Sequence, residues 1–181
     1  MGTLFRDTPG KEASVTGAAR YLVFILTAGG VLFLDQLTKA AVVSRFSLHE
    51  SLSVIPGFFD LTYVRNPGAA FGFLSSASPA FRSVFFSAVA VAAVLLILYF
   101  IIRQKDGDLF LTASLSLILG GAMGNLLDRI RFGEVVDFLD LYIGPYHWPA
   151  FNVADSAISV GACLLVYDMF RRKEKKYAEK A

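Results

Sequence analysis

Two aspartates in the last third of the chain could together perform acid–base chemistry. Asp137 and Asp155 each stand among apolar residues, in the segments 133–138 and 151–156. Apolar surroundings raise the pKa of a carboxyl group, and two neighbouring carboxylates cannot both ionise readily, so one of them keeps a proton. The ionised member of such a pair can activate water while the protonated member polarises a carbonyl group, as in aspartic proteases. Two isolated aspartates are not enough on their own to predict a catalytic pair.

Other charged residues occur at helical spacing within apolar sequence. Asp35 precedes Lys39 by four residues, which is the favourable order for an ion pair on one helix face. Asn125 and Arg129 have the same spacing, and we expect the adjacent Asp128 to pair with Arg129 or with a neighbouring loop. An ionisable side chain at the centre of a bilayer costs about 2.5–3.5 kcal/mol on insertion scales, so such residues require partners or a function.

Four long apolar segments must position these side chains. A hydrocarbon core about 30 Å thick is crossed by about 20 mostly apolar residues in a helix. The predicted spans are residues 21–43, 83–102, 109–127 and 153–170. Because only helices satisfy their own backbone hydrogen bonds in lipid, we expect all four to be helices. Gly120, Gly121 and Gly124 form a stripe of small residues that permits close packing in the third span.

The composition excludes several classes of protein. The chain has 181 residues, of which 55% are hydrophobic and 18% charged, and its mean hydropathy is +0.57. Soluble domains carry about 25% charged residues, so this is a membrane protein. A net charge of +2 gives no reason to expect a nucleic-acid partner. One cysteine and two histidines make a metal site built from these residues improbable.

The distribution of basic residues predicts the orientation in the membrane. Eleven of the 17 Lys and Arg residues lie in the segments 1–20, 103–108 and 171–181. Since Lys and Arg favour the cytoplasmic side, both termini are predicted to be cytoplasmic. We therefore expect a polar N-terminal tail at 1–19, one membrane domain at 20–170, and a basic C-terminal tail.

The two remaining segments, 44–82 and 128–152, are predicted to lie on the outer side. Residues 58–64 are rich in aromatic and β-branched residues and are flanked by turn signals, which favours a short β-sheet on the membrane surface. Residues 142–148 have the aromatic composition of a membrane interface, so we expect an amphipathic interfacial segment there. The predicted fold class is therefore membrane all-α with a small β element.

Helix geometry predicts that the polar residues converge at one depth, in the outer third of the membrane. The expected members are Asp35, Lys39, Asn125, Asp128, Arg129, Asn152 and Asp155, with Asp137 close by. An ion or proton transporter would instead place polar groups on both sides of the midplane. A non-catalytic lipid-binding scaffold is the other alternative that these residues leave open.

Five motifs in this chain resemble those of the lipoprotein signal peptidase (signal peptidase II) family. They are Asp35-Gln36-Leu37-Thr38-Lys39, Arg65-Asn66-Pro67-Gly68-Ala69-Ala70-Phe71-Gly72, Gly120-Gly121-Ala122-Met123-Gly124-Asn125-Leu126-Leu127-Asp128-Arg129, Val135-Val136-Asp137-Phe138 and Phe151-Asn152-Val153-Ala154-Asp155-Ser156. Any one of them alone would be weak, but five in the same order over residues 35–156 make a specific match.

The resemblance implies an aspartyl endopeptidase of the bacterial inner membrane, with Asp137 and Asp155 as its catalytic pair. It implies removal of the signal peptide from prolipoproteins by cleavage just before the diacylglyceryl-modified cysteine, at the periplasmic face. It also implies an outer sheet that cradles the substrate, no metal or cofactor, contact with membrane lipids, and inhibition by globomycin-type cyclic lipopeptides. We expect the protein to be a monomer.

Further residues are predicted to support the catalytic pair. Asn66, Asn125, Arg129 and Asn152 are expected to orient the peptide or the pair by hydrogen bonds. Gly68 and the Ala69-Ala70 step would allow close approach of the backbone. The other residues that we predict to support the site are Asp35, Lys39, Asp128 and Ala154.

Overall fold

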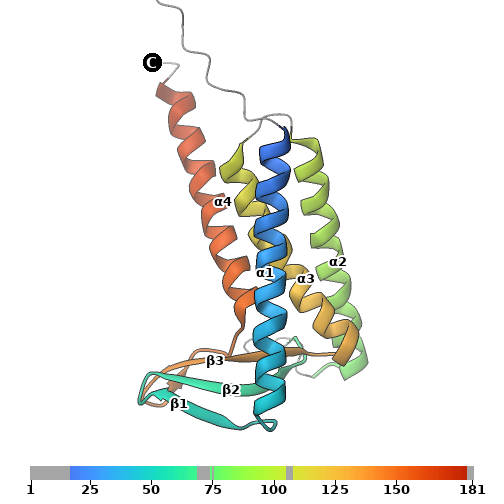
Figure 1. The fold of residues 1–181 in the computed structure, drawn as a ribbon, viewed down its shortest axis with the longest axis vertical. Helices are drawn as coiled ribbons and strands as arrows, with labels where there is room; N and C mark the ends of the chain where they lie inside the picture. The colour runs from blue at the N-terminus through green and yellow to red at the C-terminus, as the bar shows by residue number, and fades with distance from the viewer. Residues whose placement is uncertain (1–16, 69–73, 75, 105–107, 179–181) are drawn as a thin grey trace, which may run out of the picture.

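The computed structural model describes residues 17–68, 74, 76–104 and 108–178. In these residues the chain forms the helices α1 (Gly17–Arg45), α2 (Pro79–Arg103), α3 (Leu109–Phe132) and α4 (Val153–Ala178). The strands are β1 (Ser51–Ile55), β2 (Phe59–Asn66), β3 (Val135–Ile143) and β4 (Tyr146–His147). Every helix is long and apolar enough to cross a membrane. The strands lie across one end of the helices, here called the sheet end (Figure 1).

The helices contain the four predicted spans and run beyond them. α1 begins at Gly17, inside the expected tail, and α4 continues to Ala178. α3 continues to Phe132, so the first part of the predicted segment 128–152 is helical. It stops at Gly133, whose left-handed backbone (φ 75°) and N–H bond to the Arg129 carbonyl form a C-terminal cap. The tail residues 1–16 and the motif residues 69–72 lie outside the described residues.

α3 lies between the other three helices, each of which packs against it (Figure 1). A buried apolar cluster joins α1, α2 and α3 through Ala28, Ile97, Ile101, Leu115 and Leu119. Because lipid is as apolar as these side chains, the cluster stabilises the bundle through van der Waals packing between the helices and not through removal of apolar surface from water. α2 begins with Ser78, whose hydroxyl accepts from the Phe81 N–H, and with Pro79 in the first turn.

Glycines in α3 allow two neighbouring helices to approach its backbone, as predicted for the small-residue stripe. A Cβ atom on Gly121 would lie 2.4 Å from the Ala154 carbonyl oxygen of α4. A Cβ atom on Gly124 would lie 2.4 Å from Oδ2 of Asp35 on α1. The stripe therefore brings the start of α4 and the Asp35 carboxylate against the same stretch of α3.

The sheet is antiparallel with the strand order β1-β2-β3-β4. It confirms the predicted β element, and β2 contains most of the segment expected to be a strand. The aromatic segment 142–148 belongs to the same sheet, since it ends β3 and forms β4. A second apolar cluster, built from Val42, Tyr63, Val136 and Phe138, packs the sheet against the end of α1.

Candidate active site

Asp137 lies in β3 and is 1% exposed. Its Oδ2 accepts a hydrogen bond from Nδ2 of Asn66 at 2.8 Å, and its Oδ1 accepts from Nδ2 of Asn152 at 2.7 Å. Burial raises the pKa of Asp137 to about 7, and the negative charge of Asp155 acts in the same direction. The two amide donors and the charge of Lys39 oppose this rise. The carboxyl group therefore keeps a proton to a higher pH than an exposed aspartate does.

Asp155 lies in the first turn of α4, where Asn152 caps the helix. The Asp155 N–H donates to Oδ1 of Asn152 at 2.9 Å, and the Asn152 N–H donates to Oδ2 of Asp155 at 3.3 Å. This reciprocal arrangement resembles a capping box and fixes the carboxylate at the helix N-terminus, where negative charge is favourable. Oδ1 of Asp155 also accepts from Nδ2 of Asn125 at 2.7 Å.

Asn152 therefore connects the two aspartates. Its side-chain amide donates to Asp137 and its backbone amide donates to Asp155. Asn152 is fully buried (0% exposed), and its Nδ2 also lies 3.2 Å from Oδ1 of Asn125. One asparagine thus holds both carboxyl groups, which come from different elements, at one place near the sheet end.

A buried ion cluster lies behind this pair. Nζ of Lys39 is 2.9 Å from Oδ2 of Asp35, which confirms the predicted ion pair, and 2.9 Å from Oδ2 of Asp128. The same Nζ donates to Oδ1 of Asn125 at 2.9 Å, which links the cluster to Asp155 through one residue. Backbone amides bind both carboxylates as well, because the Ala154 N–H donates to Oδ1 of Asp35 and the Val136 N–H donates to Oδ2 of Asp128.

Asp128 was expected to pair with Arg129 or with a neighbouring loop. The second alternative is found, because the Val136 N–H in the predicted outer segment donates to Oδ2 of Asp128 at 3.0 Å, whereas the described residues show no ion pair between Asp128 and Arg129. The Asp128 carboxylate is directed to Lys39 on α1 instead, because successive residues of a helix point in different directions. Nη1 of Arg129 donates to the Asn125 carbonyl at 3.3 Å, and its guanidinium lies 5.7 Å from the centre of the Phe86 ring. Arg129 is thus held between α3 and α2 rather than in the ion cluster.

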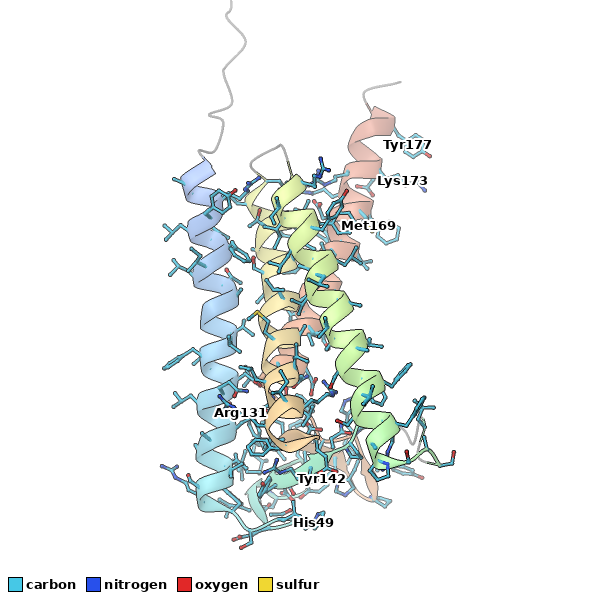
Figure 2. All side chains as sticks on the ribbon, turned by 90° about the vertical axis from the view of Figure 1, so that its right-hand side faces the viewer. His49, Arg131, Tyr142, Met169, Lys173 and Tyr177 are labelled. Carbon is cyan, nitrogen blue, oxygen red and sulfur yellow. The ribbon has the colours of Figure 1, made fainter. Side chains whose placement is uncertain are left out.

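Gln36 belongs to the ion cluster and was not predicted as a site residue. Its Nε2 lies 3.0 Å from Oδ1 of Asp128 and 3.2 Å from Oδ2 of Asp35. Its Oε1 accepts a hydrogen bond from Nη1 of Arg131 at 2.9 Å. Figure 2 shows Arg131 at the sheet end of α3, directed toward α1. The signal in the sequence was the position of Gln36 directly after Asp35, which alone does not identify its partners.

A cavity of about 250 Å³ lies beside the two aspartates. Its lining includes Asp155, Arg129, Asn66 and Gly68, together with Phe86 and the segment 148–151. Asp155 reaches this cavity directly, whereas Asp137 contacts it through its partner Asn66.

Gly68 closes one side of the cavity. Its φ of +99° favours glycine, and a Cβ atom there would lie 2.1 Å from Cδ2 of Phe86. Its N–H donates to Oδ1 of Asn66 at 2.8 Å, which orients the amide that holds Asp137. The neighbouring Ala69-Ala70 step lies outside the described residues.

All the predicted site residues within the described chain thus lie in or directly behind one pocket. Trp148 and Phe86 also line it, although the sequence suggested only an interfacial role for the segment that contains Trp148 and no site role for Phe86. The described residues contain no cluster of three or more His, Cys, Asp or Glu side chains that could hold a metal ion. Fold and site together define a multi-pass membrane protein with a polar pocket at one end of its helices.

Comparison with known proteins gives the family. The chain belongs to the signal peptidase II family, whose model, described as "Signal peptidase (SPase) II", matches residues 27–171. It is 59% identical to a lipoprotein signal peptidase of Syntrophus aciditrophicus (strain SB), over 86% of this chain and 96% of that relative. It is 49% identical to that of Syntrophotalea carbinolica, over 84% and 94% of the two chains. The protein is therefore a membrane protease.

Solved structures agree with this assignment. The fold is similar to a bacterial membrane enzyme determined by the in meso method at 2.3 Å resolution, with a TM-score of 0.76 and 33% identity over 90% of this chain and 94% of that one. A second such structure, at 1.9 Å resolution, gives a TM-score of 0.72 and 33% identity over 86% and 95% of the two chains.

Proposed function

We propose that this protein is an aspartyl endopeptidase that removes signal peptides from prolipoproteins, with Asp137 and Asp155 as its catalytic pair. It cleaves the peptide bond on the N-terminal side of the diacylglyceryl-modified cysteine. The observation that carries this proposal is the pair itself, in which the buried Asn152 holds two carboxyl groups beside a cavity at the end of the helices. Membership of the signal peptidase II family supports the choice of substrate.

The two aspartates differ in access, and this difference assigns their roles. Asp155 lines the cavity, so water and a scissile carbonyl reach it first. Asp137 is almost fully buried, and its pKa of about 7 lets it keep the proton that the pair shares near neutral pH. Asp155 is then the ionised member that activates water, and Asp137 donates a hydrogen bond to the scissile carbonyl. The pair still titrates as one coupled unit.

The reaction proceeds by addition of water followed by elimination of the amine. Asp155 takes a proton from the water as its oxygen attacks the carbonyl carbon, and Asp137 gives its proton to the carbonyl oxygen, so that a neutral gem-diol forms and is held by hydrogen bonds to the pair. The C–N bond then breaks as Asp155 passes its proton to the nitrogen of the departing cysteine and Asp137 takes a proton back from the gem-diol. The products are a signal peptide with a new carboxyl terminus and a mature protein with a free amino group.

The arrangement of helices supports entry of the substrate from the lipid. Phe86 of α2, Arg129 of α3 and Asp155 of α4 all line the cavity. α2 and α4 both pack on α3, and in the described part of the chain they make no extensive contact with each other. A substrate helix and its acyl chains could therefore remain in the membrane while the scissile bond reaches the pair. This requires the sheet end to face the periplasm and both termini the cytoplasm.

The arrangement of polar groups favours a peptidase over a transporter. The hydrogen-bonded cluster around Lys39 lies at the sheet end, whereas the buried cluster of Ala28, Ile97, Ile101, Leu115 and Leu119 further along the bundle is apolar. A conducting path would need a chain of polar groups across that region. The buried hydroxyls of Thr112, Ser114 and Ser116 do not provide one, because each donates to the backbone carbonyl four residues earlier. A scaffold would need no pair of carboxyl groups with a shared proton.

A cleavage assay with two matched precursors tests the proposal. The purified protein in lipid is given a prolipoprotein carrying the diacylglyceryl group and the same precursor without it, and the products are mapped by mass spectrometry. We expect cleavage of the modified precursor alone, with the modified cysteine as the new N-terminal residue. No cleavage, or cleavage at another bond, would contradict the proposal, and equal cleavage of both precursors would contradict recognition of the lipid.

A further inference from the structure

A second cavity, of about 380 Å³, lies at the tip of the sheet beside the candidate site. It runs between Phe58 in the β1–β2 turn and the β3–β4 hairpin, where Ile143, Tyr146, His147 and Trp148 line it. We call this cavity the tip groove. Trp148 lines both the tip groove and the site cavity, so the two adjoin. Nothing in the proposed peptide hydrolysis uses the tip groove.

The side chains around the tip groove leave large apolar surfaces uncovered. Ile143 is 73% exposed, Tyr146 81% and Trp148 62%. Exposed apolar patches of this kind in folded proteins mark contacts with partners or membranes. Tyr and Trp in particular concentrate where a membrane meets water, because their rings have both an apolar body and a polar group.

The position of the tip relative to the helices indicates which of these surfaces it meets. The sheet crosses the ends of the helices and projects sideways beyond them (Figure 1). Figure 2 shows Tyr142, at the end of β3, close to the level at which α1 ends. A sheet that projects sideways at this level must have one side next to the lipid that surrounds the helices. The tip groove thus lies near the level at which the membrane-spanning helix α1 ends (Figure 2).

The charges at the tip argue against recognition of anionic groups. Neither residues 51–64 nor residues 133–152 contain Lys or Arg. Two acidic side chains near the tip groove, Asp60 and Asp140, already have partners, because the Tyr142 hydroxyl donates to Asp60 at 3.1 Å and Nδ1 of His147 lies 3.0 Å from Asp140. Binding at the tip must therefore depend on apolar contact and not on attraction to a phosphate or to an acidic lipid.

We propose that the tip groove binds phospholipid at the glycerol and upper acyl-chain level of the leaflet at the sheet end. Ile143, Tyr146 and Trp148 then anchor the sheet to the membrane independently of the helices. The anchor fixes the height of β3 at its far end, and β3 carries Asp137. This inference concerns the membrane and does not depend on the proposed cleavage reaction.

Trp148 is the only tryptophan in the chain, so its fluorescence reports on the place where the tip groove adjoins the site cavity. The protein is reconstituted in phosphatidylcholine vesicles, with quenchers either attached to the upper acyl chains or dissolved in water as iodide. We expect strong quenching by the lipid-attached group, protection from iodide, and little change when salt or anionic lipid is added. Quenching by iodide without quenching by the lipid would overturn the proposal, as would protection from iodide that appears only when a precursor is added.

Two variants make the test specific. Ile143→Ser combined with Tyr146→Ser removes apolar contacts but leaves Trp148 in place, so we expect it to lose most of the lipid quenching. Leu52→Ser on β1 changes a similarly exposed residue outside the tip groove and should retain it. Because fluorescence needs no turnover, Asp155→Asn should give wild-type quenching whether or not the proposed function is correct. Equal quenching in the double variant and in Leu52→Ser would contradict the proposed anchor.

Discussion

Asp35 of α1 and Asp128 of α3 hold the two candidate catalytic residues in the same way. Oδ1 of Asp35 accepts a hydrogen bond at 3.0 Å from the N–H of Ala154, the residue before Asp155. Oδ2 of Asp128 accepts one at 3.0 Å from the N–H of Val136, the residue before Asp137. Lys39 lies 2.9 Å from both carboxylates, so a single ammonium group joins the two supports.

Lys39 is therefore the residue on which the geometry of the site depends most. Lys39→Met would leave the buried carboxylates of Asp35 and Asp128 without their cation, and loss of one partner of a buried pair typically costs about 3–5 kcal/mol. We expect a clear drop in the melting temperature in detergent and loss of cleavage. Lys173→Met, at an exposed lysine, serves as the control. Wild-type stability of Lys39→Met would contradict the supporting role of the ion cluster.

Gln36 provides a second test of the same cluster. Gln36→Met removes the donor that lies 3.0 Å from Asp128, and a hydrogen bond to a charged group contributes about 1.5–3 kcal/mol. Gln36→Glu should be more damaging, because it adds a third carboxylate beside two others. We expect both variants to lower kcat with little change in KM, since Gln36 does not line the site cavity. A change confined to KM would show that Gln36 acts on substrate binding instead.

The raised pKa of Asp137 predicts how stability depends on pH. The folded protein keeps a proton on Asp137 up to a pH of about 7, whereas the ordinary value is 3.8. Between these values the folded state binds more protons than the unfolded state, so stability falls as the pH rises. Asp137→Asn removes this contribution. The melting temperature of the variant minus that of the wild type should therefore increase as the pH rises from 5 to 8. A constant difference between the two proteins would contradict the raised pKa.

Labelling of a single cysteine tests the predicted orientation. Ser51→Cys is placed at the start of β1 in a Cys163→Ala background, which removes the native thiol. In intact bacterial cells with a permeable outer membrane, an impermeant thiol reagent should label this residue without lysis. A cysteine replacing Ala178, at the other end of the molecule, should react only after lysis. The reverse pattern would place the sheet end in the cytoplasm.

Local sequence patterns were sufficient for several parts of the structure. The length of the apolar segments was enough to predict the four helices, and the spacing of Asp35 and Lys39 was enough to predict an ion pair. The β-branched and aromatic composition of residues 58–64 predicted the strand β2. These features depend on residues within a few positions of one another, so helix and strand geometry determines them.

Contacts between residues far apart in the sequence could not be predicted from local sequence patterns. The partner of Asp128 on α1 and the contact of Gln36 with Asp128, 92 residues away in the sequence, depend on how α1 packs on α3. Spacing within one helix carries no information on that packing, so it could not identify Lys39 and Gln36 as partners of Asp128. The place of Trp148 between two cavities likewise follows from the fold of β3 and β4 and not from its aromatic character.

Cleavage of a diacylglyceryl-modified precursor by three Asp→Asn variants tests the catalytic pair most directly. Asp137→Asn and Asp155→Asn preserve the shape of each side chain, and Asp140→Asn on the same strand as Asp137 is the matched control. Because general acid–base groups contribute about 10²–10⁴-fold to rate, we expect each of the first two variants to lose at least about 100-fold in kcat while remaining folded. Asp140→Asn should cleave like the wild type. Normal turnover by folded Asp137→Asn or Asp155→Asn would contradict the account.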